Sequence, residues 1–464
     1  MIHDEELFFA RRLGYGLKQG EAISGGVRDW AVAQISEVPP LDFYGSDGKS
    51  IRSQLPDYAE PVPGYEEATR LVGFNFDNER IADQTAQEKL YPEWREALLR
   101  SLTAVNGPSP VFERFWAFWV NHFAVKAEQM TTMWYGPHTR LIRSHMTGKF
   151  AEMLRDAELQ PAMLYFLDNV FSTGPHSPSG LDGPGESINE NQARELFELH
   201  TMSPEGGYTQ ADVIQAAYAL TGWSFYDGKR EQKKRNAPFG VYWDFDRHEP
   251  GPRTIMGKKY GTSHRGQDQA PQLIADLAAH PATAQFISWK LIRHFVADDP
   301  PADSVARVRD AWMQSGGDLK VVHTAVIDEV IAEAPDHEKF SNPETWLHQM
   351  HRTASIAVPL TRPRGGHTIN ILCDELGQGY AAAPQPNGYP DRKSDWISKE
   401  LLERRARYAY LASSSIAAET VPYLHDFAIR LAGKDSDLVA AMQRATKPEA
   451  AATILLASPQ FMRI

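Results

Sequence analysis

Apolar residues recur at helical spacing through most of this 464-residue chain, whereas segments of alternating apolar and polar residues are scarce. The clearest example begins at Ser109-Pro110, a capping residue followed by proline at the first helical position, and continues through many aromatic residues to Phe123. We expect further helices at about 5–13, 26–36, 91–103, 137–157, 189–202, 210–222, 269–297, 303–315, 318–334, 343–357 and, with breaks, 397–458. The best strand signal is 241–245. The pattern predicts an all-α, multi-helix globular body with long structured loops and at most a small β-hairpin near 241–260.

Three long irregular segments rich in glycine, proline or polar residues interrupt the helices, at 171–187, 224–267 and 381–395. Loops of this length inside a compact chain often build functional sites, so we expect them to converge on the helix predicted at 189–202. The basic run at 229–235 is interpreted as a solvated part of its loop. We expect one domain over 1–464, in which helical subdomains at 1–170 and 188–464 are an option and 224–267 is an irregular insert.

Charge, hydropathy and cysteine content exclude several classes of function. Lys and Arg total 48 and Asp and Glu total 60, and the resulting net charge of −12 argues against nucleic acid as a partner. The longest apolar runs, such as 452–456, are far shorter than the roughly 18 to 20 residues of a membrane span. The single cysteine, Cys373, excludes an internal disulfide and a Cys-rich metal centre, so any metal would depend on His, Asp and Glu.

The densest polar stretch, 189–200, predicts a helix with two different faces. One face carries Asn191, Arg194, Glu195 and Glu198, and the other carries Ala193, Leu196, Phe197 and His200. The plainer interpretation is an exposed face whose local ion pairs each contribute about a few tenths of a kcal/mol. The alternative is that Glu195 and Glu198, with Asn191, line a cleft as metal ligands or as an acid/base pair oriented by Arg194. The apolar side favours a buried role for His200.

Two further pairs of polar residues have patterns that suggest a role. Thr209 and Asp212 have the spacing of a capping box that starts the next helix, so a helical hairpin is expected. Asn121 and His122 end the aromatic helix, where a buried polar pair must find partners. A core network and a ligand-binding role remain equally open for this second pair.

Two loop segments complete the candidates. His248 lies within Asp246-Arg247-His248-Glu249 of the insert, and polar residues in a structured loop serve sites more often than the same residues on a helix surface. Asn387 lies in Pro386-Asn387-Gly388-Tyr389-Pro390-Asp391, where the residue types require no more than a turn.

These motifs together resemble the bacterial family of domain of unknown function 1800. The central strings are Asn189-Glu190-Asn191, Ala193-Arg194-Glu195, Glu198-Leu199-His200, Gly206-Gly207-Tyr208-Thr209 with Asp212, and Leu220-Thr221-Gly222-Trp223. The outer blocks, in order, are Phe118-Trp119 with Asn121-His122-Phe123, Pro161-Ala162-Met163 with Leu167-Asp168-Asn169, His248 with Gly257, His280-Pro281-Ala282-Thr283, Lys290-Leu291 with Arg293-His294-Phe295, Pro386-Asn387-Gly388 with Pro390-Asp391, and Ala457-Ser458-Pro459-Gln460-Phe461. The resemblance extends over nearly the whole chain.

The resemblance supplies a family but no established reaction. It implies that such proteins are often exported and are commonly encoded beside a sulfatase-like partner of the domain of unknown function 1501 family. In this sequence the first residues are acidic and no apolar stretch follows them, so the expected location is cytoplasmic, while the resemblance leaves export to the periplasm open.

Two functions compete on these observations. The first is an enzyme acting on a polar substrate, by hydrolytic or redox chemistry, with or without a divalent metal cofactor. Its catalytic residues would be Glu195, Glu198, Arg194 and His122, its binding residues Asn121, Glu190, Asn191, His248 and Asn387, and its metal candidates Glu195, Glu198, His122 and His248. A metal-free form would be an acid/base pair like that of a glycosidase. The second is a non-catalytic helical scaffold for the sulfatase-like partner or a cell-surface assembly, in which the motif is a buried network that fixes two helices.

Overall fold

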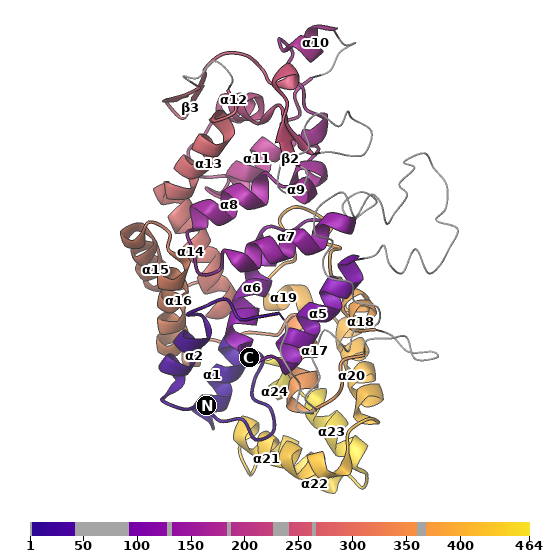
Figure 1. Ribbon diagram of the computed structural model, residues 1–464. Helices are drawn as coiled ribbons and strands as arrows, with labels where there is room; N and C mark the ends of the chain where they lie inside the picture. The colour runs from indigo at the N-terminus through magenta and orange to yellow at the C-terminus, as the bar shows by residue number, and fades with distance from the viewer. Residues whose placement is uncertain are drawn as a thin grey trace, which may run out of the picture.

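The computed structural model describes residues 2–41, 92–127, 132–182, 187–225, 241–261, 266–359 and 368–464. These residues are mainly helical, so the expected fold class is confirmed. Figure 1 shows a body that is longer in one direction, with α10 (Pro178–Asp182) at one end and α22 (Asp437–Arg444) at the other. The basic run at 229–235 lies outside the described residues.

The elements follow one another along the chain in three groups. The first contains α1 (Glu5–Leu13), α2 (Val27–Gln34), α5 (Pro92–Asn106), α6 (Pro110–His122), α7 (Thr132–Ser144), α8 (Phe150–Glu158), α9 (Pro161–Phe166), η3 (Asn169–Phe171), α10, α11 (Asn191–Glu198) and α12 (Gln210–Leu220). The second contains β1 (Trp223–Phe225), β2 (Val241–Trp243), η6 (Phe245–Arg247), β3 (Arg253–Ile255), β4 (Lys258–Tyr260), α13 (Gln269–Ala279), α14 (Pro281–Phe295), α15 (Ala302–Ser315), α16 (Leu319–Glu333) and η7 (Ala334–Asp336). The third contains α17 (Pro343–Thr353), α18 (Ile369–Glu375), α19 (Lys393–Trp396), α20 (Lys399–Ser413), η8 (Ala418–Thr420), α21 (Val421–Ala432), α22, α23 (Pro448–Leu456) and α24 (Pro459–Met462).

Two helices that the periodicity predicts as continuous are each divided. The 269–297 segment forms α13 and α14, because Pro281 has no N–H to continue the first helix but suits the first position of the second. The 137–157 segment forms α7 and α8, and between them Lys149 makes an isolated antiparallel bridge to Asp318. Both breaks therefore fall where the backbone hydrogen bonds of the helix are replaced by others.

The strands of the described residues form two small antiparallel sheets rather than one hairpin. β2 pairs back with β1, with Trp223 opposite Trp243, and β3 pairs with β4. The β3–β4 turn consists of Met256 and Gly257, whose φ angles of 49° and 77° are those of the left-handed turn that matches strand twist.

Buried apolar side chains form two main clusters. The first contains the aromatic residues of α6 together with the apolar faces of α8 and of α11 to α16. The second contains α5 and the helices from α17 to α24. Helix α6 lies near the middle of the molecule and packs on α5 as well as α7, so its C-terminal end is close to both halves (Figure 1).

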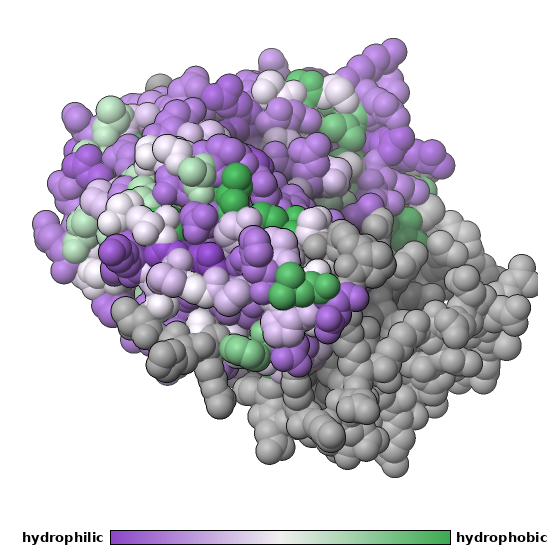
Figure 2. Space-filling model, turned by 90° about the horizontal axis from the view of Figure 1, so that it is seen from above, coloured by the Kyte–Doolittle hydropathy of each residue, from purple (hydrophilic) through white to green (hydrophobic). Residues whose placement is uncertain are grey.

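The face of the molecule that Figure 2 shows is largely polar where the structure describes it. Seen from above, the surface is mainly hydrophilic with small separate hydrophobic areas (Figure 2). Large aromatic side chains such as Trp116, Trp119 and Phe123 are fully buried instead. Within the described ranges, no helix combines the length and the apolar character that crossing a membrane requires.

Candidate functional site

Helix α11 carries the predicted polar face. Ala193, Leu196 and Phe197 are fully buried in the first apolar cluster, whereas Arg194 and Glu198 are partly exposed. The helix and α12 form the expected hairpin, and the capping box is confirmed, because Thr209 Oγ1 accepts from Asp212 N and the Asp212 carboxylate accepts from Thr209 N. The turn therefore fixes the polar face of α11 against the start of α12.

An ion-paired network covers part of this face. Arg194 donates to Glu190 Oε2 at 3.1 Å and to Gln210 Oε1 at 3.0 Å, and its Nη1 lies 3.6 Å from Glu198 Oε1. Gln210 Nε2 also donates to Glu190 Oε2, at 2.6 Å. About a third of each charged side chain remains exposed, so these pairs hold side-chain orientation more than they add stability.

Glu195 differs from its neighbours on the same face. It is half-buried, and its carboxylate makes no hydrogen bond or ion pair with any other described residue. Burial raises the pKa of Glu195, and the nearby Glu198 charge raises it further against the opposing effects of His200 and Arg194. Its neutral form therefore persists to higher pH than that of an ordinary glutamate.

The layer behind Glu195 is polar although fully buried. His200 Nδ1 lies 2.5 Å from Glu158 Oε1, and Gln192 Nε2 donates to the Glu158 backbone oxygen at 2.7 Å and to Oε2 at 3.2 Å. His200 Nε2 and Gln192 Oε1 are buried without a hydrogen-bond partner among the described residues. His200 is thus a buried histidine, as the apolar side of the helix predicts.

His122 supports this layer from the end of α6. Lys290 Nζ lies 2.9 Å from His122 Nδ1, and His122 Nε2 lies 3.3 Å from the His200 backbone oxygen. Burial, then the Lys290 charge, keeps the pKa of His122 well below its usual value, and burial lowers the pKa of Lys290 to about 8. The geometry fits a neutral imidazole that accepts from the ammonium and donates to the carbonyl.

Asn121 faces in another direction, toward the 381–395 loop. Its Nδ2 donates to Tyr389 O at 3.0 Å and its Oδ1 accepts from Tyr389 N at 2.7 Å. Gly388 has a φ of 72°, and a Cβ there would lie 2.3 Å from the Asn121 backbone oxygen, so the approach requires glycine. Asn387, the preceding residue, is exposed.

His248 lies at the C-terminal end of α12. Its Nδ1 is 2.8 Å from Thr221 O, while Arg247 donates to Thr173 Oγ1 at 3.0 Å and His176 contacts Glu249 at 2.7 Å. The insert and the loop that begins at 171 therefore meet each other.

The predicted residues fall into separate places. Glu190, Asn191, Arg194, Glu195 and Glu198 share the α11 region, and His122 lies behind it. No hydrogen bond or ion pair between described residues joins Glu195 to His248 or to Asn387. In the same ranges, no group of three or more His, Cys, Asp or Glu side chains is arranged to hold a metal ion.

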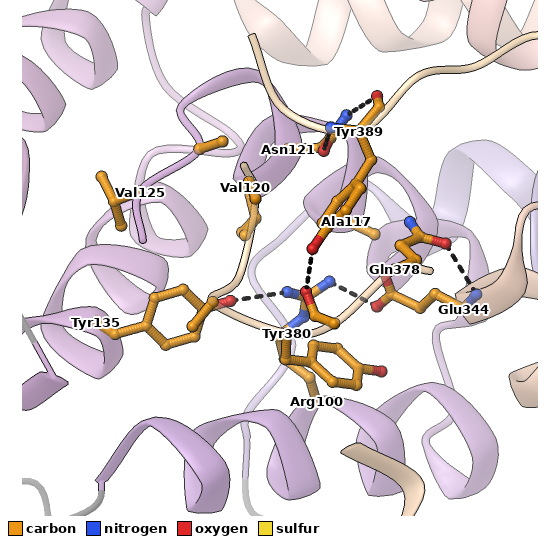
Figure 3. A pocket seen from close by; sticks show the side chains of 14 residues that line it. Arg100, Ala117, Val120, Asn121, Val125, Tyr135, Glu344, Gln378, Tyr380 and Tyr389 are labelled. Carbon is orange, nitrogen blue, oxygen red and sulfur yellow. Dashed lines mark hydrogen bonds and ion pairs between the residues drawn. The ribbon is translucent and has the colours of Figure 1, made fainter. Parts of the chain in front are cut away.

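A polar cavity that the sequence did not indicate lies on the Asn121 side of α6 (Figure 3). Next to Asn121 it consists of two adjoining pockets, of which the one that contains Arg100 is the larger. Both pockets are lined by Ala117, Asn121, Glu344 and Gln378. Helix α6, helix α17 and the segment from 378 to 391 thus form shared walls.

The larger pocket contains a complete ion pair. Arg100 Nη2 donates to Glu344 Oε1 at 2.6 Å, and the guanidinium lies over the rings of Trp116 and Tyr380. Tyr135 OH accepts from Arg100 Nη1 at 3.4 Å, a contact that Figure 3 shows beside the ion pair. The charges in this pocket are therefore matched.

The smaller pocket contains Arg114, His294 and Asp391. His294 Nδ1 lies 2.9 Å from Asp391 Oδ1, and Arg114 Nε donates to His294 Nε2 at 3.4 Å. Burial lowers the pKa of His294, and the charges of His294 and Lys339 keep the pKa of Asp391 far below its usual value despite burial. A cation inside the aromatic α6 segment was the one local signal of this pocket, and it points to no particular partner.

Comparisons with known proteins give a single match. A family model described as "Protein of unknown function (DUF1800)" matches residues 8–463. No curated protein and no solved structure matches the chain.

Proposed function

Since this chain belongs to the DUF1800 family, whose description specifies no reaction, we propose from its own geometry that it is an enzyme that transfers a proton to or from a polar substrate at the α11 face. Glu195 is the proposed acid/base. The observation that carries the proposal is that Glu195 is the one charged side chain of this face that is half-buried and lacks a partner among the described residues, with its pKa raised by burial.

The surroundings of the two carboxylates differ in the way that acid/base pairs require. Glu198 has a cation 3.6 Å away and a hydrogen bond with Tyr208. Glu195 has no such partner, and desolvation favours its neutral form. Two neighbouring carboxylates in such different surroundings are a usual arrangement for general acid/base catalysis.

Arg194 and Asn191 complete the proposed substrate site. Arg194 keeps part of its guanidinium exposed beside Glu195, where it can bind an oxygen of a polar substrate. His122, which lies behind the face and contacts Lys290 and His200, is proposed as a positioning residue. A metal would require ligands in addition to Glu195 and Glu198.

A scaffold is the second candidate, and one observation favours it. Asn121, His122 and Gln192 each join elements that are distant in sequence, as fold-holding residues do. In that case the exposed part of the α11 face would contact a protein, such as the sulfatase-like partner that the family resemblance implies.

The test compares Glu195→Gln with Glu152→Gln, an exposed glutamate on α8. Wild-type protein is assayed against aryl glycosides, aryl esters and aryl phosphates, with elemental analysis of untagged protein for bound metal. We expect Glu195→Gln to lower kcat by about 100-fold or more on any substrate turned over, and Glu152→Gln to leave it unchanged. An activity that survives in Glu195→Gln at the wild-type rate would remove Glu195 from the mechanism. The scaffold would be favoured if wild-type protein shows neither turnover nor bound metal and if Arg194→Ala abolishes binding to a partner protein.

A further inference from the structure

We propose that the smaller pocket beside Asn121 binds the anionic group of a small molecule, a carboxylate or a phosphate, and that Arg114 receives it. This site is separate from the α11 face and does not depend on the function proposed for Glu195. Four observations support it: the partners of Arg114, the pairing of the acids around it, the donors that share its pocket, and the size of that pocket.

Arg114 is a buried cation whose hydrogen bonds are long. Only 2% of it is exposed, yet its two hydrogen bonds are long, 3.4 Å to His294 Nε2 and 3.5 Å to Gly14 O, and it forms no ion pair with another described residue. A guanidinium has five N–H donors, and a buried charge without a partner is strongly unfavourable.

Other buried arginines show what Arg114 lacks. Arg143 makes two short hydrogen bonds to Glu113, at 2.8 and 2.7 Å, and Arg100 makes one of 2.6 Å to Glu344. Arg12 donates to backbone oxygens, including one bond of 2.6 Å. Each of these side chains makes at least one short hydrogen bond inside the fold, and Arg114 makes none.

The acidic side chains of the cavity already have cations or donors of their own. Glu344 accepts from Arg100, and Asp391 is held by His294, with Lys339 donating to the Asp391 backbone oxygen at 2.6 Å. Because both carboxylates contact other groups, neither forms an ion pair with Arg114. The charge of Arg114 therefore favours a bound anion.

The neutral side chains of the pocket also present donors. Gln378 accepts from Glu344 N through Oε1, and Asn342 accepts from Thr345 N through Oδ1. These bonds leave the Nε2 of Gln378 and the Nδ2 of Asn342 as donors beside Arg114 in the same pocket. Converging N–H donors with one guanidinium are the usual surroundings of a bound carboxylate or phosphate. The pocket is small, so it limits the guest to a small molecule.

Binding is tested with sodium acetate and inorganic phosphate at constant ionic strength, by isothermal titration calorimetry and by the shift in Tm. We expect saturable binding of at least one probe to wild-type protein, and the stronger probe identifies the anion class. Arg114→Gln should weaken this binding about tenfold or more. Arg307→Gln, at an exposed arginine on α15, and Glu195→Gln should bind the probe as wild-type protein does.

A second measurement covers the case in which Arg114→Gln does not fold. In wild-type protein the Nε–Hε signal of Arg114 in ¹⁵N NMR should shift on addition of the probe, while that of Arg143 stays in place. Absence of binding by both probes, or binding that leaves the Arg114 signal unmoved, would overturn the proposal. The function proposed for Glu195 is tested by turnover, and the Arg114 site is tested by anion binding. A negative result in one measurement therefore does not decide the other.

Discussion

Asn121 and Asn387 show how differently two similar residues can serve the same loop. The side chain of Asn121 satisfies both backbone groups of Tyr389, whereas Asn387 is exposed two residues away from it. Both were singled out from the sequence, but the residue type alone does not indicate which asparagine holds the loop.

Asn121→Ala should therefore lower the free energy of unfolding by about 1 to 3 kcal/mol, because it leaves a partly buried N–H and C=O without partners. Asn387→Ala is the matched control and should change the free energy of unfolding by less than about 0.5 kcal/mol. Urea denaturation of the two variants measures both values. Equal effects would show that the amide contacts of Asn121 do not hold the loop.

The raised pKa of Glu195 predicts a pH dependence of stability with a definite sign. A group that binds its proton more tightly in the folded state contributes stability that is fully present below its unfolded pKa, near 4.5, and is lost as pH rises through the folded pKa. Relative to Glu195→Gln, wild-type protein should thus lose stability as pH rises above about 4.5. Glu152→Gln should show no such trend in the same series of denaturant titrations.

At the scale of elements, local signals in the sequence predict helix starts better than helix continuity. The start of α12 is encoded within four residues by Thr209 and Asp212, and the structure has the capping box. The division at Pro281 follows from the proline itself, whereas the division between α7 and α8 depends on distant backbone, since Phe150 N donates to Gly317 O and Leu319 N donates to Gly148 O. Periodicity contains no information about such partners.

The capping box gives a prediction at this scale. Thr209→Ala removes the acceptor for Asp212 N and should lower the free energy of unfolding by about 1 kcal/mol, whereas Thr209→Ser keeps an oxygen and should cost much less. Thermal unfolding of both variants checks the order. If the serine variant is destabilised as much as the alanine variant, the side-chain oxygen is not what starts α12.

At the scale of the whole molecule, composition and periodicity predict the fold class but not the cavity. The cavity forms where α5, α6, α14, α17 and the 378–391 segment meet. The hydrogen bonds between these elements join residues that are far apart in the sequence, such as Arg114 and His294. The sequence drew attention to Asn121 and to the 386–391 loop, both of which line or border the cavity. It gave no reason to select Arg114, Arg100 or Glu344, since a charged residue in a helix is most often a solvated one.

The two apolar clusters are joined by α1 through consecutive arginines. Arg12 donates to Val296 O and His337 O, while Arg11 donates to Gln349 Oε1 and Phe461 O. Each substitution to alanine should lower the free energy of unfolding by at least about 1.5 to 3 kcal/mol, since hydrogen bonds from a charged donor are lost inside the protein. Arg28→Ala, at an exposed ion pair, should cost about 0 to 1 kcal/mol in the same chemical denaturation. A comparable loss in all three would argue against this bridging role.

The last two residues of α6, Asn121 and His122, connect this helix to two different parts of the molecule. Successive side chains on a helix diverge by about 100°. Asn121 therefore hydrogen-bonds the 381–395 loop, while His122 contacts the backbone oxygen of His200 behind α11. Both side chains belong to the last turn of α6, so this turn is fixed to two separate parts of the molecule. A displacement of this turn would therefore change both contacts together, whereas a change of rotamer at Asn121 or at His122 would change only one of them.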